Sequence, residues 1–274
     1  MKFVQRLERA WAAGDTLLCV GLDPDPARMP KHLAGSKHPM FEFGRAIVDA
    51  TADLVCAFKP QIAYYAAARA EDQLEMTIDH IRRRYPDIPV ILDAKRGDIG
   101  GTAGMYAKEA FERYQADAVT VNPYLGFDAL APFLDFQEKG VIVLCRTSNP
   151  GARDVQDIES DGRKLYQIIA EKAAREWNAN ANVLLVVGAT YPEELAQIRT
   201  IVGDMPILAP GVGAQGGDVA AIVANGATAD GTGLVISASR AVLYAGSGAD
   251  YAQAARSAAK KLRDEINRCR KAGR

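Results

Sequence analysis

The segment ILDAKRGDIGGT (91–102) contains the residues best suited to chemistry. It begins as an apolar strand in which Asp93 and Lys95 are two positions apart, so both side chains are expected on the same face. Asp98 follows in the next loop. A lysine among carboxylates stays protonated, because opposite charges favour the ammonium form. This favours general acid catalysis at an atom that gains negative charge over Schiff-base chemistry, which needs a neutral amine. An ion-pair network with a purely structural role is an equal alternative on spacing alone.

Two further charges follow apolar runs. Asp23 ends TLLCVGLD (16–23), and Lys59 lies near the end of LVCAFKP (54–60). Either could be an ordinary surface charge beyond a strand. Because charges are costly to bury, several of them at neighbouring strand ends indicate a site.

A glycine-rich turn, LAPGVGAQGGD (208–218), and the segment ISASRAV (236–242) predict a phosphate site. Glycines let backbone N–H groups approach an anion closely. Arg240 can bind phosphate by donating two parallel hydrogen bonds. The alternative is a flexible loop beside a surface arginine. Ser148, in RTSNPG (146–151), is a weaker candidate for binding the edge of a polar ring. The histidines lie away from strand ends and are interpreted as non-catalytic.

Short apolar runs alternate with helical patterns along the whole chain. Many are continuously apolar, which is typical of parallel strands buried on both faces. They are 16–23, 54–60, 89–95, 117–123, 140–148, 182–190, 206–211 and 233–239. Eight such units predict an α/β fold, a single (β/α)8 TIM barrel over residues 1–274, with its site at the carboxyl ends of the strands. An open doubly wound sheet is less favoured, because no GxGxxG follows the first strand.

Composition sets the broad class. The 274 residues are 49% hydrophobic and 24% charged, and 33 Lys+Arg against 34 Asp+Glu leave a net charge of −1. We therefore expect a soluble protein without nucleic-acid or membrane partners. The first 15 residues lack the apolar core of a signal peptide. They predict an amphipathic helix with Phe3, Leu7, Ala10 and Trp11 on its apolar face. Cysteines within apolar runs, at positions 19, 56 and 145, favour buried thiols in a reducing compartment, and we expect the cytoplasm.

Taken together, these motifs resemble the orotidine 5'-phosphate decarboxylase family. The specific match is DAKRGDIGGT combined with PGVGAQGGD, supported by VGLDPD, AFKPQ, SNPG and Arg240. The matching motifs are spread over nearly the whole chain. Its length and the phrases VNPYLGFDAL and ISASRAV are similar to the longer bacterial branch of the family.

The resemblance implies a carboxy-lyase that converts orotidine 5'-phosphate to uridine 5'-phosphate and carbon dioxide, without metal or cofactor. Lys59, Asp93, Lys95 and Asp98 would be the catalytic residues and form an alternating charge array. Lys95 would protonate C6 of the pyrimidine as carbon dioxide leaves, with Asp93 near the substrate carboxylate. The substrate would further contact a set of polar residues: ribose at Asp23 and Lys59, the base at Ser148, and the 5'-phosphate at Pro210, Gln215 and Arg240. Asp98 and Thr102 would enter the site of the other subunit, which makes the unit a homodimer.

Two other functions remain open. Similar barrels that use magnesium on sugar phosphates need a carboxylate where this chain has Lys59, and a cation there would repel the ion. A non-enzymatic phosphate-binding module would not need Lys95 with its flanking carboxylates. The chain also departs from shorter family members, which have glycine at position 239 where it has Ser239. The stretches 29–40 and 153–166 are longer than connecting loops require and have no assigned role.

Overall fold

The computed structural model describes residues 1–212 and 218–272. Its main sheet has eight parallel strands in the order β2-β1-β10-β9-β8-β5-β4-β3. Parallel bridges from Phe58 to Val90 and from Gln61 to Asp93 join the two end strands, β2 and β3, and close the sheet. The strands are β1 (Leu18–Leu22), β2 (Ala57–Pro60), β3 (Ile91–Arg96), β4 (Ala118–Val121), β5 (Gly140–Arg146), β8 (Val183–Val187), β9 (Ile207–Pro210) and β10 (Leu234–Ala238). Each overlaps one predicted run, and the (β/α)8 barrel is confirmed.

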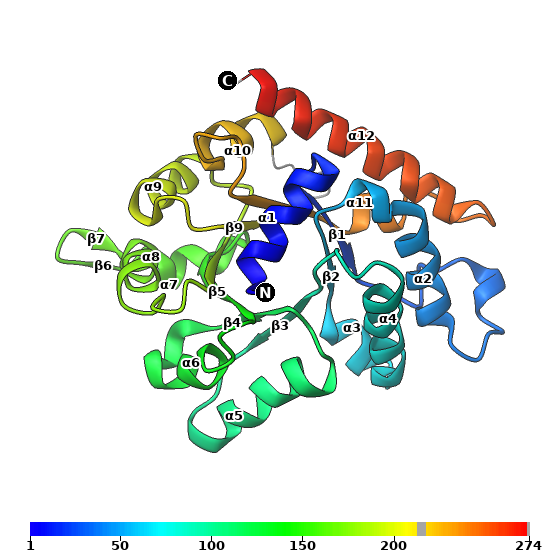
Figure 1. Cartoon of the computed structure of the whole chain (residues 1–274), viewed down its shortest axis with the longest axis horizontal. Coiled ribbons are helices and arrows are strands. Elements are labelled where there is room, and N and C mark those ends of the chain that lie inside the picture. Colours follow the sequence, from blue (N-terminus) through cyan, green and yellow to red (C-terminus); the bar gives the residue numbers. More distant parts are fainter. Residues whose placement is uncertain (213–217, 273–274) are drawn as a thin grey trace.

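Helices alternate with these strands and form a ring around them (Figure 1). The α-helices are α1 (Phe3–Gly14), α2 (Pro39–Thr51), α3 (Ile62–Ala67), α4 (Glu71–Arg84), α5 (Gly100–Lys108), α6 (Phe127–Leu134), α7 (Arg153–Gln156), α8 (Leu165–Arg175), α9 (Pro192–Val202), α10 (Val219–Gly226), α11 (Arg240–Leu243) and α12 (Tyr251–Ala272). Shorter helical turns are η1 (Lys31–Leu33), η2 (Ala52–Leu54), η3 (Glu109–Arg113), η4 (Pro123–Leu125) and η5 (Pro150–Ala152). A small antiparallel hairpin joins β6 (Glu159–Ser160) to β7 (Arg163–Lys164). Within residues 1–212 and 218–272, no helix combines the length and apolar character needed to cross a membrane.

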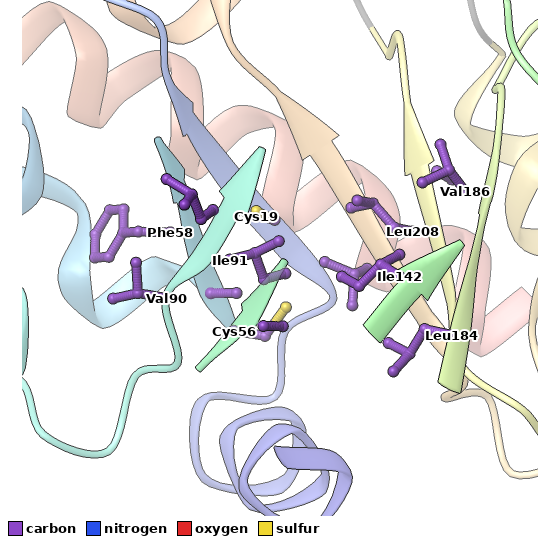
Figure 2. Close-up of a cluster of buried hydrophobic side chains, with 14 of the residues drawn as sticks. Cys19, Cys56, Phe58, Val90, Ile91, Ile142, Leu184, Val186 and Leu208 are labelled. Atoms are coloured by element: carbon purple, nitrogen blue, oxygen red, sulfur yellow. The ribbon is translucent and has the colours of Figure 1, made fainter. Parts of the chain in front are cut away.

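Apolar side chains from the strands form the core. Every residue of β1, β2, β8 and β10 is buried, which explains the lack of polar alternation in the sequence. Figure 2 shows side chains from several strands packed together, with Cys19 and Cys56 among them. These two and Cys145 are buried free thiols, as predicted.

Helix α1 covers the amino-terminal ends of the strands. Its buried residues are the four on the predicted apolar face: Phe3, Leu7, Ala10 and Trp11. The Phe3 N–H donates to the carbonyl of Glu138 at 3.0 Å, just before β5 begins. A Cβ at Gly140 would lie 2.3 Å from the Phe3 ring, so glycine is needed at this close approach. In Figure 1, α1 lies across the centre of the ring. A ligand site must therefore open at the other end, where the strands finish.

Candidate active site

Three charged side chains meet where β2 and β3 end. Lys59 Nζ lies 2.7 Å from Asp93 Oδ2, and Lys95 Nζ lies 2.5 Å from Asp93 Oδ1. The side chains of Lys59 and Asp93 are only 5% and 10% exposed, whereas that of Lys95 is 46% exposed. One carboxylate thus holds a buried ammonium on one oxygen and a solvent-accessible ammonium on the other.

Electrostatic interactions keep Lys59 and Asp93 charged. Burial alone would lower the pKa of Lys59, but attraction to Asp93 and Asp23 outweighs burial and raises that pKa above its ordinary value. Burial alone would raise the pKa of Asp93, but the ammonium groups of Lys59 and Lys95 hold it well below its ordinary value. The site therefore contains a fixed charge array at neutral pH.

The backbone that presents Lys95 is irregular, which the strand spacing did not predict. Leu92 pairs with Val119 and Arg96 with Val121, so β3 gains residues relative to β4 in between. Lys95 has a φ of 47°, in the left-handed region that non-glycine residues seldom adopt. The expectation that Asp93 and Lys95 lie together is met, but a bulge rather than regular alternation brings them together.

A cavity of about 460 Å³ opens above this cluster. Its lining comes from the carboxyl ends of the strands and the loops that follow: Asp23, Lys59, Gln61, Tyr64, Asp93, Lys95, Thr147, Ser148, Asn149, Val186, Pro210, Gly211, Val212, Ser237, Ser239 and Arg240. Val186 also belongs to the buried cluster in Figure 2, so the top of the core forms part of the cavity wall.

Asp23 offers an acceptor to a ligand in this cavity. Its Oδ1 is buried and has no hydrogen-bond partner among the residues that the structure describes. Its carbonyl accepts from the Tyr244 hydroxyl at 2.8 Å, which fixes the backbone at the end of β1. A buried acceptor without a partner is costly, and a ligand hydroxyl would satisfy it.

Ser239 fits beside Asp23 because of a glycine in the neighbouring strand. A Cβ at Gly21 would lie 1.9 Å from Ser239 Oγ, so a side chain at position 21 would collide with the serine. Ser239 itself has a φ of −113°, which needs no glycine. The serine that stands where shorter family members have glycine is therefore not held in the left-handed region. Arg240 follows, exposed at the start of α11.

The structure brings most of the predicted site residues to one cavity: Asp23, Lys59, Asp93, Lys95, Ser148, Pro210 and Arg240. Asp98 and Thr102 do not line it. Asp98 Oδ1 accepts from the N–H of Ile99 at 2.8 Å, and Thr102 is exposed in the first turn of α5. Gln215 lies outside the described residues.

Several lining residues were not among the predicted site residues. Gln61 and Ser237 lie in motifs that the sequence singled out, AFKPQ and ISASRAV, so their positions carried a signal. Tyr64 lies within α3, beyond any strand end, and no spacing indicated it. Among the described residues, no three His, Cys, Asp or Glu side chains group as a metal site would.

Arg146 ends β5 but does not line the cavity. It is completely buried and pairs with Asp157 at 3.0 Å and Glu194 at 3.6 Å. Its guanidinium also lies over the rings of Tyr166 and Tyr191. This cluster anchors the 153–166 insertion to the barrel.

The insertion also supports the cavity wall. Gln156 Oε1 accepts from the Thr147 N–H at 2.9 Å, and Gln156 Nε2 donates to Thr147 Oγ1 at 2.8 Å. This pairing fixes the residue before Ser148. The 29–40 stretch, in contrast, contributes no residue to the cavity lining.

Comparison with known proteins gives full-length matches. Residues 16–257 match the model of the Orotidine 5'-phosphate decarboxylase / HUMPS family. Orotidine 5'-phosphate decarboxylase of Ralstonia pickettii is 63% identical over 270 residues, covering 98% of this chain and 100% of that protein. The Azoarcus sp. enzyme of the same name is 61% identical over 267 residues, covering 97% and 99%. The structure of Leishmania donovani OMP decarboxylase matches with a TM-score of 0.86 at 38% identity, covering 98% of this chain and 99% of that one.

Proposed function

The chain belongs to the orotidine 5'-phosphate decarboxylase / HUMPS family, and from this premise we propose how it acts as an orotidine 5'-phosphate decarboxylase of pyrimidine biosynthesis. The observation that carries the proposal is the Lys59–Asp93–Lys95 array, which faces a cavity at the carboxyl end of the barrel. Loss of carbon dioxide leaves an electron pair on an sp² carbon, C6, with no adjacent π system to absorb it. A cation already fixed beside that carbon stabilises the charge without reorganisation.

Lys95 is the proton donor in this mechanism. The Lys95 side chain is 46% exposed and that of Lys59 only 5%, so we assign proton transfer to the more accessible ammonium of Lys95. As the bond between C6 and the carboxylate breaks, carbon dioxide departs, the electron pair stays on C6, and a proton moves from Lys95 Nζ to C6. Asp93 Oδ1 pairs with this ammonium, and Asp93 lies near the substrate carboxylate.

The remaining cavity residues hold the substrate. Asp23 Oδ1, a buried acceptor with no hydrogen-bond partner in the described part of the chain, accepts from a ribose hydroxyl, and Lys59 assists. Ser148 binds the edge of the pyrimidine ring. Arg240 and the backbone near Pro210 bind the 5'-phosphate, with Gln215 assigned to the same role. Binding energy from the distant phosphate then contributes to catalysis at C6.

We infer that the working unit is a homodimer. Asp98 and Thr102 do not line the cavity of their own chain, and exposed apolar residues occur in the same segment and in η4. Ile99, Met105 and Tyr124 are 59%, 65% and 80% exposed. Exposed apolar side chains favour burial against a second copy, which would deliver Asp98 and Thr102 to the partner's cavity. The reaction needs neither metal nor organic cofactor in this proposal, and the enzyme works in the cytoplasm.

The direct test is the ultraviolet absorbance of orotidine 5'-phosphate mixed with the purified protein, with and without EDTA. We expect the orotate absorbance to decay at a rate that EDTA does not change. Decay that EDTA abolishes would contradict the metal-free mechanism. No decay with folded protein would contradict the activity and direct attention to magnesium-dependent sugar-phosphate chemistry.

A further inference from the structure

Thr120 lies in β4, directly behind the charged array. It is 1% exposed and does not line the cavity. Its Oγ1 accepts from the backbone N–H of Ala94 at 3.0 Å and of Lys95 at 2.9 Å. The same hydroxyl donates to Asp93 Oδ1 at 3.0 Å. One side chain thus contacts three consecutive residues of β3.

The bulge in β3 explains why a hydroxyl is needed there. Between the pairs Leu92–Val119 and Arg96–Val121, β3 has residues 93–95 and β4 has only Thr120. A bulge leaves backbone N–H groups without their regular ladder partners, and buried donors must be paired. Thr120 Oγ1 supplies the acceptor that the ladder lacks.

Every hydrogen-bonding position of the Thr120 hydroxyl is occupied. A threonine oxygen offers two lone pairs and one proton. Both lone pairs face backbone N–H groups, so its proton must point to Asp93 Oδ1. That oxygen is the one that also binds Lys95 Nζ. Thr120 therefore fixes both ends of the lysine: the left-handed backbone at its base and the counter-ion at its tip.

We propose that Thr120 is a positioning residue for the proton donor, and this rests on the proposed decarboxylase activity. It touches no substrate and acts through Lys95 and Asp93. Because a reacting group displaced by about 1 Å can lose roughly 100-fold in rate, a loosened bulge is expected to reduce turnover far more than binding.

The test compares Thr120→Val, which removes the hydroxyl, with Thr120→Ser, which keeps it. We expect T120V to lower kcat by about 10- to 100-fold. Its KM and its Kd for uridine 5'-phosphate should stay within about threefold, because the phosphate and ribose contacts are elsewhere. T120S should recover most of the lost kcat.

Thr51→Val is the matched control. Thr51 is also a fully buried threonine, and its hydroxyl donates to the Ile47 carbonyl at 2.8 Å within α2, away from the cavity. T51V should lose stability, measured as Tm, with kcat unchanged. Should T120V fail to fold, Thr120→Ala is compared with T120S in its place.

Three results would overturn the inference: kcat within threefold of wild type in T120V, an equal loss of kcat and product affinity, or equal impairment of T120S and T120V. An inactive wild type that still folds would contradict the proposed function instead. The two failures are therefore distinguishable.

Discussion

Lys59 and Lys95 bind the two oxygens of one carboxylate and both line the cavity, but they differ in exposure. Lys59 is 5% exposed and Lys95 is 46% exposed. The buried lysine holds Asp93 in place, and the lysine with the more exposed side chain is the better placed to give a proton to a ligand. We therefore assign proton donation to Lys95 and the positioning of the Asp93 carboxylate to Lys59.

Removing the donor should stop turnover. Lys95→Ala eliminates the proton source and the cation that stabilises C6, so we expect kcat to fall by about 1,000-fold or more. Steady-state assays at saturating orotidine 5'-phosphate measure the loss. Unchanged affinity for uridine 5'-phosphate would show that the cavity is intact. Near-normal kcat in a folded variant would refute the assigned role.

Asp93 links the array to acid stability. Burial alone would raise the pKa of Asp93, but the two lysines lower it more strongly. The folded carboxyl therefore stays ionised at a pH at which the unfolded one binds a proton. Its contribution to stability is present above the unfolded-state pKa of about 3.9 and is lost as pH falls toward the lower folded value. We expect the difference in unfolding free energy between wild type and Asp93→Asn to shrink as pH drops below about 4. Denaturant titrations at several pH values measure it, and a pH-independent difference would contradict the assignment.

The sequence identified site residues where charge interrupts an apolar run. Asp23, Lys59 and Asp93 were recognisable because a buried strand rarely ends in charge without a reason. Thr120 carried no such signal, because threonine is an ordinary strand former within DAVTVNP. Its role depends on a bulge, which exists only once β3 and β4 are paired.

Strands and helices were predictable where the burial of their side chains leaves an apolar pattern in the sequence. The eight strands of the barrel were found because most of their residues are buried, and α1 was found because its apolar face is periodic. The left-handed backbone at Lys95 was not predictable, since side-chain alternation does not encode φ. Likewise, the 153–166 insertion gave no pattern that revealed its contacts with Arg146 and Thr147.

That insertion has a consequence for substrate binding. Gln156 pairs with both the N–H and the hydroxyl of Thr147, next to Ser148. We expect Gln156→Leu to raise KM by roughly 5- to 10-fold with a smaller change in kcat, as expected for loss of about 1 kcal/mol of hydrogen bonding.

Gln73→Leu is the control for this change. Gln73 Oε1 also accepts backbone N–H groups, from Met40 at 2.9 Å and Phe41 at 3.2 Å, but it lies on α4, outside the cavity lining. Kinetics and product affinity are measured for both variants. Equal KM values in Q156L and wild type would show that the insertion does not support the base-binding segment.

At the scale of the whole molecule, the site of one chain is incomplete under the proposed mechanism. Asp98 and Thr102 belong to the motif that carries Asp93 and Lys95, but they do not line the cavity of their own chain. The exposed apolar residues of the same region, Ile99 and Met105, indicate why two copies would associate there. Activity would then require the assembly, because each copy would complete the cavity of the other.

Mixed subunits test this directly. An Asp98→Ala subunit paired with a Lys59→Ala subunit has one site with Lys59 and the partner's Asp98 both intact, and one site lacking both. Random exchange makes half of the dimers mixed, so about one quarter of wild-type activity per chain should return. Mixing Lys59→Ala with Asp93→Ala subunits should restore nothing, because both residues belong to the same chain's half of the site. Native mass spectrometry verifies exchange. Recovery in both mixtures, or in neither after verified exchange, would contradict a site completed by Asp98 across the interface.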